Sequence, residues 1–320
     1  MSAQRLNRAP RLFLVRHGQT TSNTIHALDT ALPGADLTPL GRQQATEAGE
    51  ALASRTRRLK VVSSQAARAQ QTAVNLAVAF ARAGGQLVPA GGSSSFFSDG
   101  TAAHLAEQAL SGAHERPGAA DSPPHSPSAP ALPTPRELLD TLGMIPGVAE
   151  IAAGDMEMRN DEDAHQAYLG ILGGWLHGQR DDRVPGGHTA WEVLGQYVPQ
   201  LLGLLGEAGG AGAAGAGENS AAAGEPYDIA LVSHGAVIRL VAQFLGNVDP
   251  DWALAAYLKN AQAVELDPAG AMDLLGDSEP SLGAAISPEG AVLTPEDVEQ
   301  WENSMKVVSW ADHGTPEPRS

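Results

Sequence analysis

Cysteine is absent from this chain of 320 residues, and its absence excludes several kinds of chemistry. A disulfide, a thiolate-bound metal and a cysteine nucleophile all require that residue. Aromatic residues are also scarce, at 4 %, although 42 % of the sequence is hydrophobic. A core must therefore consist mainly of Ala, Val and Leu.

Long apolar runs are missing as well. The first apolar run, residues 12–15, follows a polar N-terminal stretch and is shorter than the hydrophobic region of a signal peptide, which has about 7 to 15 residues. No run in the sequence approaches the ~20 apolar residues that cross a membrane. We therefore predict a protein of the cytoplasm with no membrane partner.

Basic residues are few. The sequence has 20 Lys and Arg against 37 Asp and Glu, which gives a net charge of −17 at pH 7. A protein that binds nucleic acid needs a basic face, and none is visible in this composition, so we predict no nucleic-acid partner. An anionic substrate would need a few cations gathered at one site inside a repulsive overall field.

The apolar patterns that are present predict an α/β fold. Short β-prone runs alternate with longer stretches of helical periodicity, and the order β-α-β-α favours a parallel sheet with right-handed crossovers. We predict a three-layer sandwich in which helices cover both faces of a mostly parallel sheet. The predicted strands are residues 12–15, 59–62, 228–233, 261–266 and 306–310, and the predicted helices are residues 39–57, 65–83, 161–176, 189–205 and 235–245.

Three segments of low complexity interrupt this pattern. Residues 90–135 are rich in Ser and Pro, residues 206–224 in Gly and Ala, and residues 267–295 in Gly, Pro and acidic residues. Such compositions bury too little apolar surface to offset the entropy of ordering. We expect flexible insertions within one domain spanning residues 1–320, with one short helix at 102–110.

Two of the predicted strands end in the same way, with a histidine and then a glycine. The pairs are His17-Gly18 and His234-Gly235. Because parallel strands present their carboxyl ends at one sheet edge, where open α/β sheets bind ligands, we expect both imidazoles to meet there. Arg16 precedes the first pair, and Arg68 lies in the first turns of the helix that follows a third strand.

Two imidazoles and two guanidinium groups at one edge favour a phosphate site. Arginine offers forked N–H donors that match phosphate oxygens. A neutral histidine can attack phosphorus, and fixed cations stabilise the charge of the transition state. The leaving alkoxide needs a proton, for which Glu150 in the extended segment 147–151 is the best candidate and Glu157 the competitor. We expect burial to raise the pKa of Glu150 towards its working range.

The residues of these sites occur in motifs that resemble a known family, the histidine phosphatase superfamily in its phosphoglycerate-mutase-like branch. The motifs, in the order of that family, are Arg16-His17-Gly18-Gln19-Thr20-x-x-Asn23, Asp36-Leu37-Thr38-x-x-Gly41, Ser63-Ser64-x-x-x-Arg68, Gly147-Val148-Ala149-Glu150 and Ser233-His234-Gly235. The resemblance implies His17 as nucleophile, Glu150 as proton donor, and Arg16, Arg68 and His234 with Gly235 as the phosphate pocket. It also implies Gln19 and Asn23 as secondary substrate contacts, with no metal and no organic cofactor.

Two features depart from that family. Pro185-Gly186-Gly187-His188-Thr189 stands where members often have Glu-Ser after the glycines, and we expect packing to absorb this change. The insertion 90–135 contains Arg116 as its only Lys or Arg, which disfavours a mutase that holds a second acidic group. The other histidines (His26, His104, His165, His177 and His188) are interpreted as ordinary polar residues, since their spacings match no metal site.

These observations predict a phosphatase that hydrolyses a phosphomonoester of a small metabolite through a phosphohistidine at His17. A phosphoglycerate-type mutase is the alternative among enzymes, and a catalytically idle protein that binds a phospho-ligand is the alternative from another class. The presence of all four residues Arg16, His17, Arg68 and His234 disfavours the idle protein. A homodimer is left open as a further partner.

Overall fold

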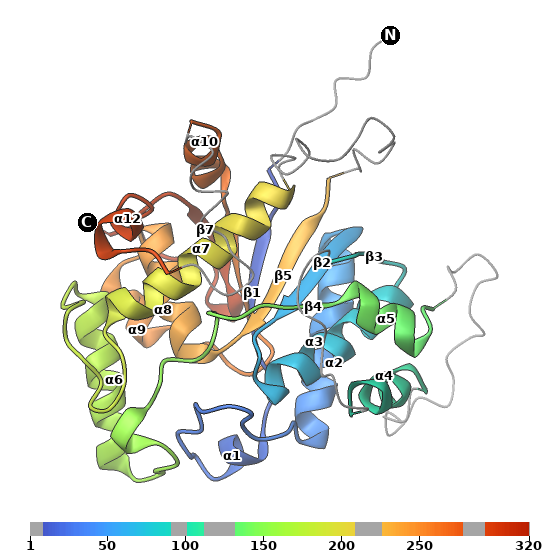
Figure 1. The fold of residues 1–320 in the computed structure, drawn as a ribbon, viewed down its shortest axis with the longest axis horizontal. Helices are drawn as coiled ribbons and strands as arrows, with labels where there is room; N and C mark the ends of the chain where they lie inside the picture. Colours follow the sequence, from blue (N-terminus) through green and yellow to red (C-terminus); the bar gives the residue numbers. More distant parts are fainter. Residues whose placement is uncertain (1–8, 91–100, 112–131, 209–225, 278–291, 320) are drawn as a thin grey trace.

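The computed structural model describes residues 9–90, 101–111, 132–208, 226–277 and 292–319, and it contains a seven-stranded sheet flanked by helices (Figure 1). The strands lie in the order β3-β2-β5-β1-β6-β7, and β4 also pairs with β2. The strands are β1 (Leu12–Arg16), β2 (Arg58–Ser63), β3 (Gln86–Val88), β4 (Gly143–Met144), β5 (Asp228–Ser233), β6 (Ala263–Asp267) and β7 (Lys306–Trp310). Pairings among β1 to β5 are parallel, and β6 joins β1 and β7 in antiparallel fashion.

Successive residues of the central strands face opposite cores. In β1, Leu12 and Leu14 belong to one buried cluster, whereas Phe13 and Val15 belong to another. All five residues of β1 are buried, because helices cover both faces of the sheet. Fully burying such a side chain stabilises the fold by about 1.5–3 kcal/mol. The sheet therefore forms the middle of three layers.

The helices divide between these two faces (Figure 1). Residues of one group pack with Phe13 and Val15: α2 (Pro39–Arg55), α3 (Ala67–Arg82), α4 (Thr101–Ser111) and α5 (Pro135–Thr141). Residues of the other group pack with Leu12 and Leu14: α6 (Glu162–Leu176), α7 (Ala190–Ala208), α8 (Gly235–Gly246), α9 (Pro250–Ala255), α10 (Ala269–Asp277) and α12 (Pro295–Glu299). The prediction of a three-layer α/β sandwich with a mostly parallel sheet is confirmed.

Local signals fix where several helices begin. Thr38 accepts a hydrogen bond from the Gly41 amide, and Pro39 opens α2. Asp161 caps α6 in the same way. At α7, Thr189 and Glu192 exchange side-chain and backbone hydrogen bonds, which is the reciprocal cap expected from their spacing.

The parallel register brings three strand ends to one edge. Arg16 at the end of β1 is paired with Ser233 of β5, and Ser63 of β2 is paired with Val232. The pairing continues past the strands, since the His17 amide donates to the Ser233 carbonyl at 3.0 Å. The residues after these strands therefore meet at the same edge, where α1 (Thr21–Thr24) also lies.

Some segments differ from the sequence prediction. Residues 269–277, predicted to lie in a loop, form α10, because Ala271 is apolar and packs into the core. The short strand β3 was not predicted, and segment 147–151, predicted as a short strand or an extended segment, contains no strand. The short helix expected at 102–110 is confirmed as α4. The rest of the predicted insertions 90–135, 206–224 and 267–295 lies largely outside the described residues. Over the described ranges, no helix is long and apolar enough to span a membrane.

Candidate active site

His17 follows β1 directly, and its hydrogen bonds define which ring nitrogen carries the proton. Nδ1 lies 2.8 Å from the Gly18 carbonyl oxygen. A carbonyl can only accept, so Nδ1 must donate and the lone pair of the neutral ring lies on Nε2. Burial, followed by the positive charges of Arg68 and Arg16, holds the pKa of His17 well below its ordinary value. The imidazole is therefore neutral and has the electronic form of a nucleophile.

The backbone around His17 is held from two sides. Its carbonyl accepts hydrogen bonds from Asn260 Nδ2 at 3.1 Å and from the Ala261 amide at 3.2 Å. The Gly18 amide donates to Thr72 Oγ1 on α3 at 2.9 Å. These contacts fix the end of β1 between α3 and the segment that precedes β6.

His234 follows β5, and its ring lies at 60° to that of His17 with 5.4 Å between the centroids. Arg68 Nε donates to Nδ1 of His234 at 3.2 Å, so the proton of this imidazole is on Nε2, which donates to Ser64 Oγ at 2.7 Å. Burial and the charge of Arg68 lower the pKa of His234 well below its ordinary value. His234 is fully buried, and its hydrogen bond with Arg68 Nε holds that guanidinium group in position.

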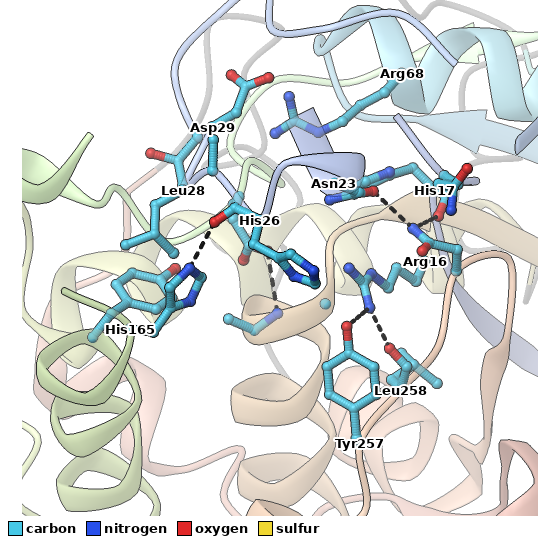
Figure 2. A pocket seen from close by; sticks show the side chains of 18 of the residues that line it. Arg16, His17, Asn23, His26, Leu28, Asp29, Arg68, His165, Tyr257 and Leu258 are labelled. Carbon is cyan, nitrogen blue, oxygen red and sulfur yellow. Dashed lines mark hydrogen bonds between the residues drawn. The ribbon is translucent and has the colours of Figure 1, made fainter. Parts of the chain in front are cut away.

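Arg16 is anchored through one end of its guanidinium group (Figure 2). Nη1 donates to the Tyr257 hydroxyl at 2.7 Å and to the Leu258 carbonyl at 2.6 Å. The buried Nε has no hydrogen-bond partner within the described part of the chain. Gly235 makes room for this group, since a Cβ there would lie 3.1 Å from Arg16 Nε. Arg16 therefore keeps an unsatisfied donor next to the start of α8.

Arg68 also keeps an unsatisfied donor. Its Nε is bound to His234, but the buried Nη1 has no partner among the residues that the structure describes. Burial lowers the pKa of Arg68, while the negative charges of Glu150 and Asp29 act in the opposite direction. A buried donor without a partner costs free energy, and an oxyanion would relieve that cost at both arginines.

The side chains of His17, Arg16 and Arg68 open into one cavity of about 400 Å³. Arg16, His17, Arg68 and Glu150 line one part of it, which we call the arginine end. A second part, which we call the outer wall, is lined by residues of the loop after α1 and of α6, namely His26, Ala27, Leu28, His165 and Leu169. Figure 2 shows Arg16, His17 and Arg68 on one side of the pocket and Leu28 and His165 on the other, with His26 between them.

Comparison with known families agrees with this geometry. A family model described as the histidine phosphatase superfamily (branch 1) matches residues 12–83 and 108–272. The chain belongs to this superfamily.

Matches to individual relatives are either short or low in sequence identity. The chain is similar to the PE-PGRS family protein PE_PGRS11 of Mycobacterium tuberculosis, with 49 % identity over 63 residues. This match covers 20 % of the chain and spans only 11 % of the length of that relative. Among similar solved structures, a mycobacterial glucosyl-3-phosphoglycerate phosphatase has 22 % sequence identity and a TM-score of 0.48, and the match covers 81 % of this chain and 90 % of that one. The phosphoserine phosphatase of Entamoeba histolytica has 18 % identity and a TM-score of 0.43, and the match covers 81 % of this chain and 91 % of that one.

Most of the predicted site residues surround the pocket of this superfamily member. Those that line it are Arg16, His17, Gln19, Asn23, Arg68, Glu150 and Gly235, whereas His234 lies behind it. Asn23 accepts a hydrogen bond from Asn260 at 3.1 Å and also caps α1. Gln19 accepts one from Thr38 at 2.9 Å. The motif residues thus meet at one place, as the parallel sheet requires.

Glu150 reaches the pocket in a different environment from the one expected. Glu150 is half-buried rather than enclosed by apolar residues. Its carboxylate accepts hydrogen bonds from the Ala236 and Val237 amides at 3.2 and 2.9 Å. These amides open α8, where the helix dipole favours a negative charge. The start of α8 therefore orients Glu150 beside Gly235.

Glu157, the competing acid, is engaged elsewhere. Its carboxylate accepts hydrogen bonds from the amides of Thr30 and Ala31 at 2.7 and 2.9 Å, and from the Thr30 hydroxyl. It does not line the pocket, whereas Glu150 does. This arrangement makes Glu157 a support for the loop that begins near Asp29.

Several residues that line the pocket of this superfamily member were not predicted from the sequence. They are Asp29, Tyr168, Arg239, Tyr257 and Asn260, together with His26 and His165. His165 Nε2 donates to the His26 carbonyl at 2.7 Å, which joins α6 to the loop after α1. These residues occur in no motif that the sequence reading used, although Arg239 lies close enough to His234 on one helix to have drawn attention. Across the described ranges, no group of three His, Asp or Glu side chains could hold a metal ion.

Proposed function

We propose that the protein hydrolyses phosphomonoesters of small molecules through a phosphohistidine at His17. The observation that carries this proposal is the combination of an Nε2 lone pair on neutral His17 with unsatisfied donors on Arg16 and Arg68 in the same pocket. A dianionic phosphate would accept hydrogen bonds from both arginines. It would then present its phosphorus to His17.

The reaction has two steps that balance. In the first, a bond forms between His17 Nε2 and phosphorus while the ester P–O bond breaks, and Glu150 gives its proton to the leaving oxygen. In the second, a water oxygen attacks phosphorus, Glu150 takes a proton from that water, and the P–N bond breaks to release inorganic phosphate. Arg16 and Arg68 stabilise the charge on the equatorial oxygens in both steps.

The test is phosphate release from an aryl phosphate by the wild-type protein and by His17→Ala. We expect the variant to lose turnover by a factor of about 10³ or more, while circular dichroism and the melting temperature show that it remains folded. A brief incubation with ³²P-labelled substrate should label the wild type with an acid-labile, base-stable phosphate. Retained activity of His17→Ala, or no label at all, would contradict the nucleophile assignment.

The alternatives give different results in the same assay. A mutase would interconvert phosphoglycerate isomers without releasing phosphate, and an idle binding protein would bind phosphate without turnover. Location in the cytoplasm, a possible homodimer and the absence of a nucleic-acid partner stay predictions from the sequence.

A further inference from the structure

The charges that line the pocket are nearly balanced before a substrate enters. Among the described residues, three arginines and two carboxylates line it, together with histidines. The third arginine, Arg239, is buried and donates to the carbonyls of Ala253, at 3.1 Å, and Leu254. Arg239 is therefore committed to the end of α9, and the unsatisfied donors are those of Arg16 and Arg68.

A bound dianionic phosphate would neutralise the remaining positive charge of the pocket arginines. The two negative charges of the phosphate and the charge of Asp29 together match the three arginines, even when the charge of Glu150 is left out of the sum. A carboxylate elsewhere on the substrate would add a negative charge with no partner. In a partly buried pocket, an unpaired charge is costly, and the net charge of −17 makes the surrounding field unfavourable as well.

Asp29 places a fixed negative charge beside the arginine end. Its Oδ2 accepts hydrogen bonds from Ser22 Oγ at 2.7 Å and from the Ala35 amide at 2.9 Å, so the side chain is held in position. Its charge acts on Arg68. Figure 2 shows Asp29 and Arg68 on the same side of the pocket.

The outer wall offers no compensating cation. Its five residues present two imidazoles and three apolar side chains, and it includes no Lys or Arg of the described chain. Leu169 is 43 % exposed although it lines the cavity. Outside the described ranges the only Lys or Arg residues of the sequence are Arg5, Arg8 and Arg116. A leaving group at this wall would meet apolar surface and neutral polar groups.

We propose that the leaving group of the substrate is an uncharged alcohol whose carbon surface packs against Leu28 and Leu169, and that hydroxy acids are poor leaving groups here. This proposal rests on the proposed phosphatase activity and specifies its substrate class.

The test uses pairs of monoesters that differ by one carboxylate. Glycerol 3-phosphate is compared with 3-phosphoglycerate, and phenyl phosphate with 4-carboxyphenyl phosphate. We expect kcat/KM to be about tenfold or more higher for the uncharged member of each pair, the size of one unpaired charge at a partly solvated site. Equal or inverted values would overturn the proposal even though hydrolysis itself occurred.

Binding to His17→Ala separates this proposal from the proposed function. Calorimetry with the same pairs should give a Kd that is lower for the uncharged member, whether or not the wild type turns it over. Equal affinities would overturn the inference about the leaving group. Absence of turnover in the wild type would instead overturn the phosphatase.

A variant of the outer wall gives the sharpest check. Leu169→Lys adds a cation at an exposed position, so it should raise kcat/KM selectively for the acid member of each pair, by about three- to fivefold. Leu274→Lys is the matched control, since Leu274 is similarly exposed, at 42 %, on α10 and does not line the pocket. An unchanged preference in Leu169→Lys, or the same change in the control, would contradict the role of the outer wall.

Discussion

The arginine end and the outer wall of one pocket are built in opposite ways. Arg16, His17 and Arg68 are each at most 9 % exposed, and they follow strands or sit on the buried helix α3. The outer wall comes from the loop after α1 and from α6, and it includes exposed side chains such as His26 and Leu169. The first region is fixed by the sheet, whereas the second can change without disturbing the core. Reaction chemistry and substrate choice are therefore separable in this molecule.

Among changes at the arginine end, we expect Arg68→Gln to have the largest effect on activity. Arg68 joins His234 to the pocket and carries an unsatisfied buried donor, so its loss should lower kcat/KM by about 10³-fold. Arg68→Lys should not restore activity, because one ammonium group cannot reproduce the planar fork. Steady-state kinetics with an aryl phosphate measures both variants. Arg82→Gln, at the exposed end of the same helix, is the control and should keep wild-type kinetics.

Glu150→Gln tests the acid of the arginine end. Glutamine can still accept one of the two amide hydrogen bonds of α8 through its single side-chain oxygen, but it cannot give a proton to the leaving oxygen. We expect kcat to fall by about 10²- to 10³-fold for alkyl phosphates, and much less for 4-nitrophenyl phosphate, whose leaving group needs no proton. The control is Glu157→Gln, which should change stability and leave the dependence on the leaving group unaltered. A uniform loss over all leaving groups in Glu150→Gln would contradict a role as general acid.

The buried imidazoles should also make stability depend on pH. The pKa of His17 and that of His234 are both lowered in the folded protein from the ordinary value of 6.5. As pH falls below 6.5, the unfolded chain therefore binds more protons than the folded one, and the free energy of unfolding decreases. Each imidazole contributes at most about 1.4 kcal/mol per pH unit to this slope, and the full stability is present above pH 6.5.

Urea denaturation at pH 7.5, 6.5 and 5.5 measures that slope. His17→Asn should make it shallower, whereas His188→Asn, which replaces an exposed histidine, should leave it as in the wild type. Equal slopes in His17→Asn and the wild type would show that burial of this imidazole does not govern the loss of stability below pH 6.5.

The two regions also differ in how far the sequence predicts them. His17, His234 and Arg68 were accessible because apolar runs define strands, and a parallel sheet brings their ends together. Glu150 was found by its motif, but its contact with α8 was not, since a carboxylate that caps a helix remote in sequence leaves no periodic signal. Tyr257 and Asn260 form hydrogen bonds with Arg16 and His17, which are more than 230 residues away in the sequence. The segment that carries them leads into β6, and its path depends on the antiparallel direction of that strand. A pattern of apolar residues marks a strand without giving its direction.

Tyr257→Phe should have the smallest effect on activity, and it tests whether Tyr257 belongs to the arginine end or to the outer wall. Its hydroxyl accepts from Arg16 Nη1, and its ring centre lies 5.2 Å from the Arg16 guanidinium carbon, yet the side chain is 55 % exposed in the pocket. Tyr257→Phe removes one of two acceptors that hold Arg16, so kcat should fall and the inhibition constant of phosphate should rise, each by about two- to fivefold. Tyr227→Phe, before β5 and away from the pocket, is the control for loss of a phenol. If Tyr257→Phe changed KM for bulky esters but left phosphate inhibition intact, Tyr257 would belong functionally with the outer wall, because a residue that positions Arg16 must alter how phosphate itself is bound.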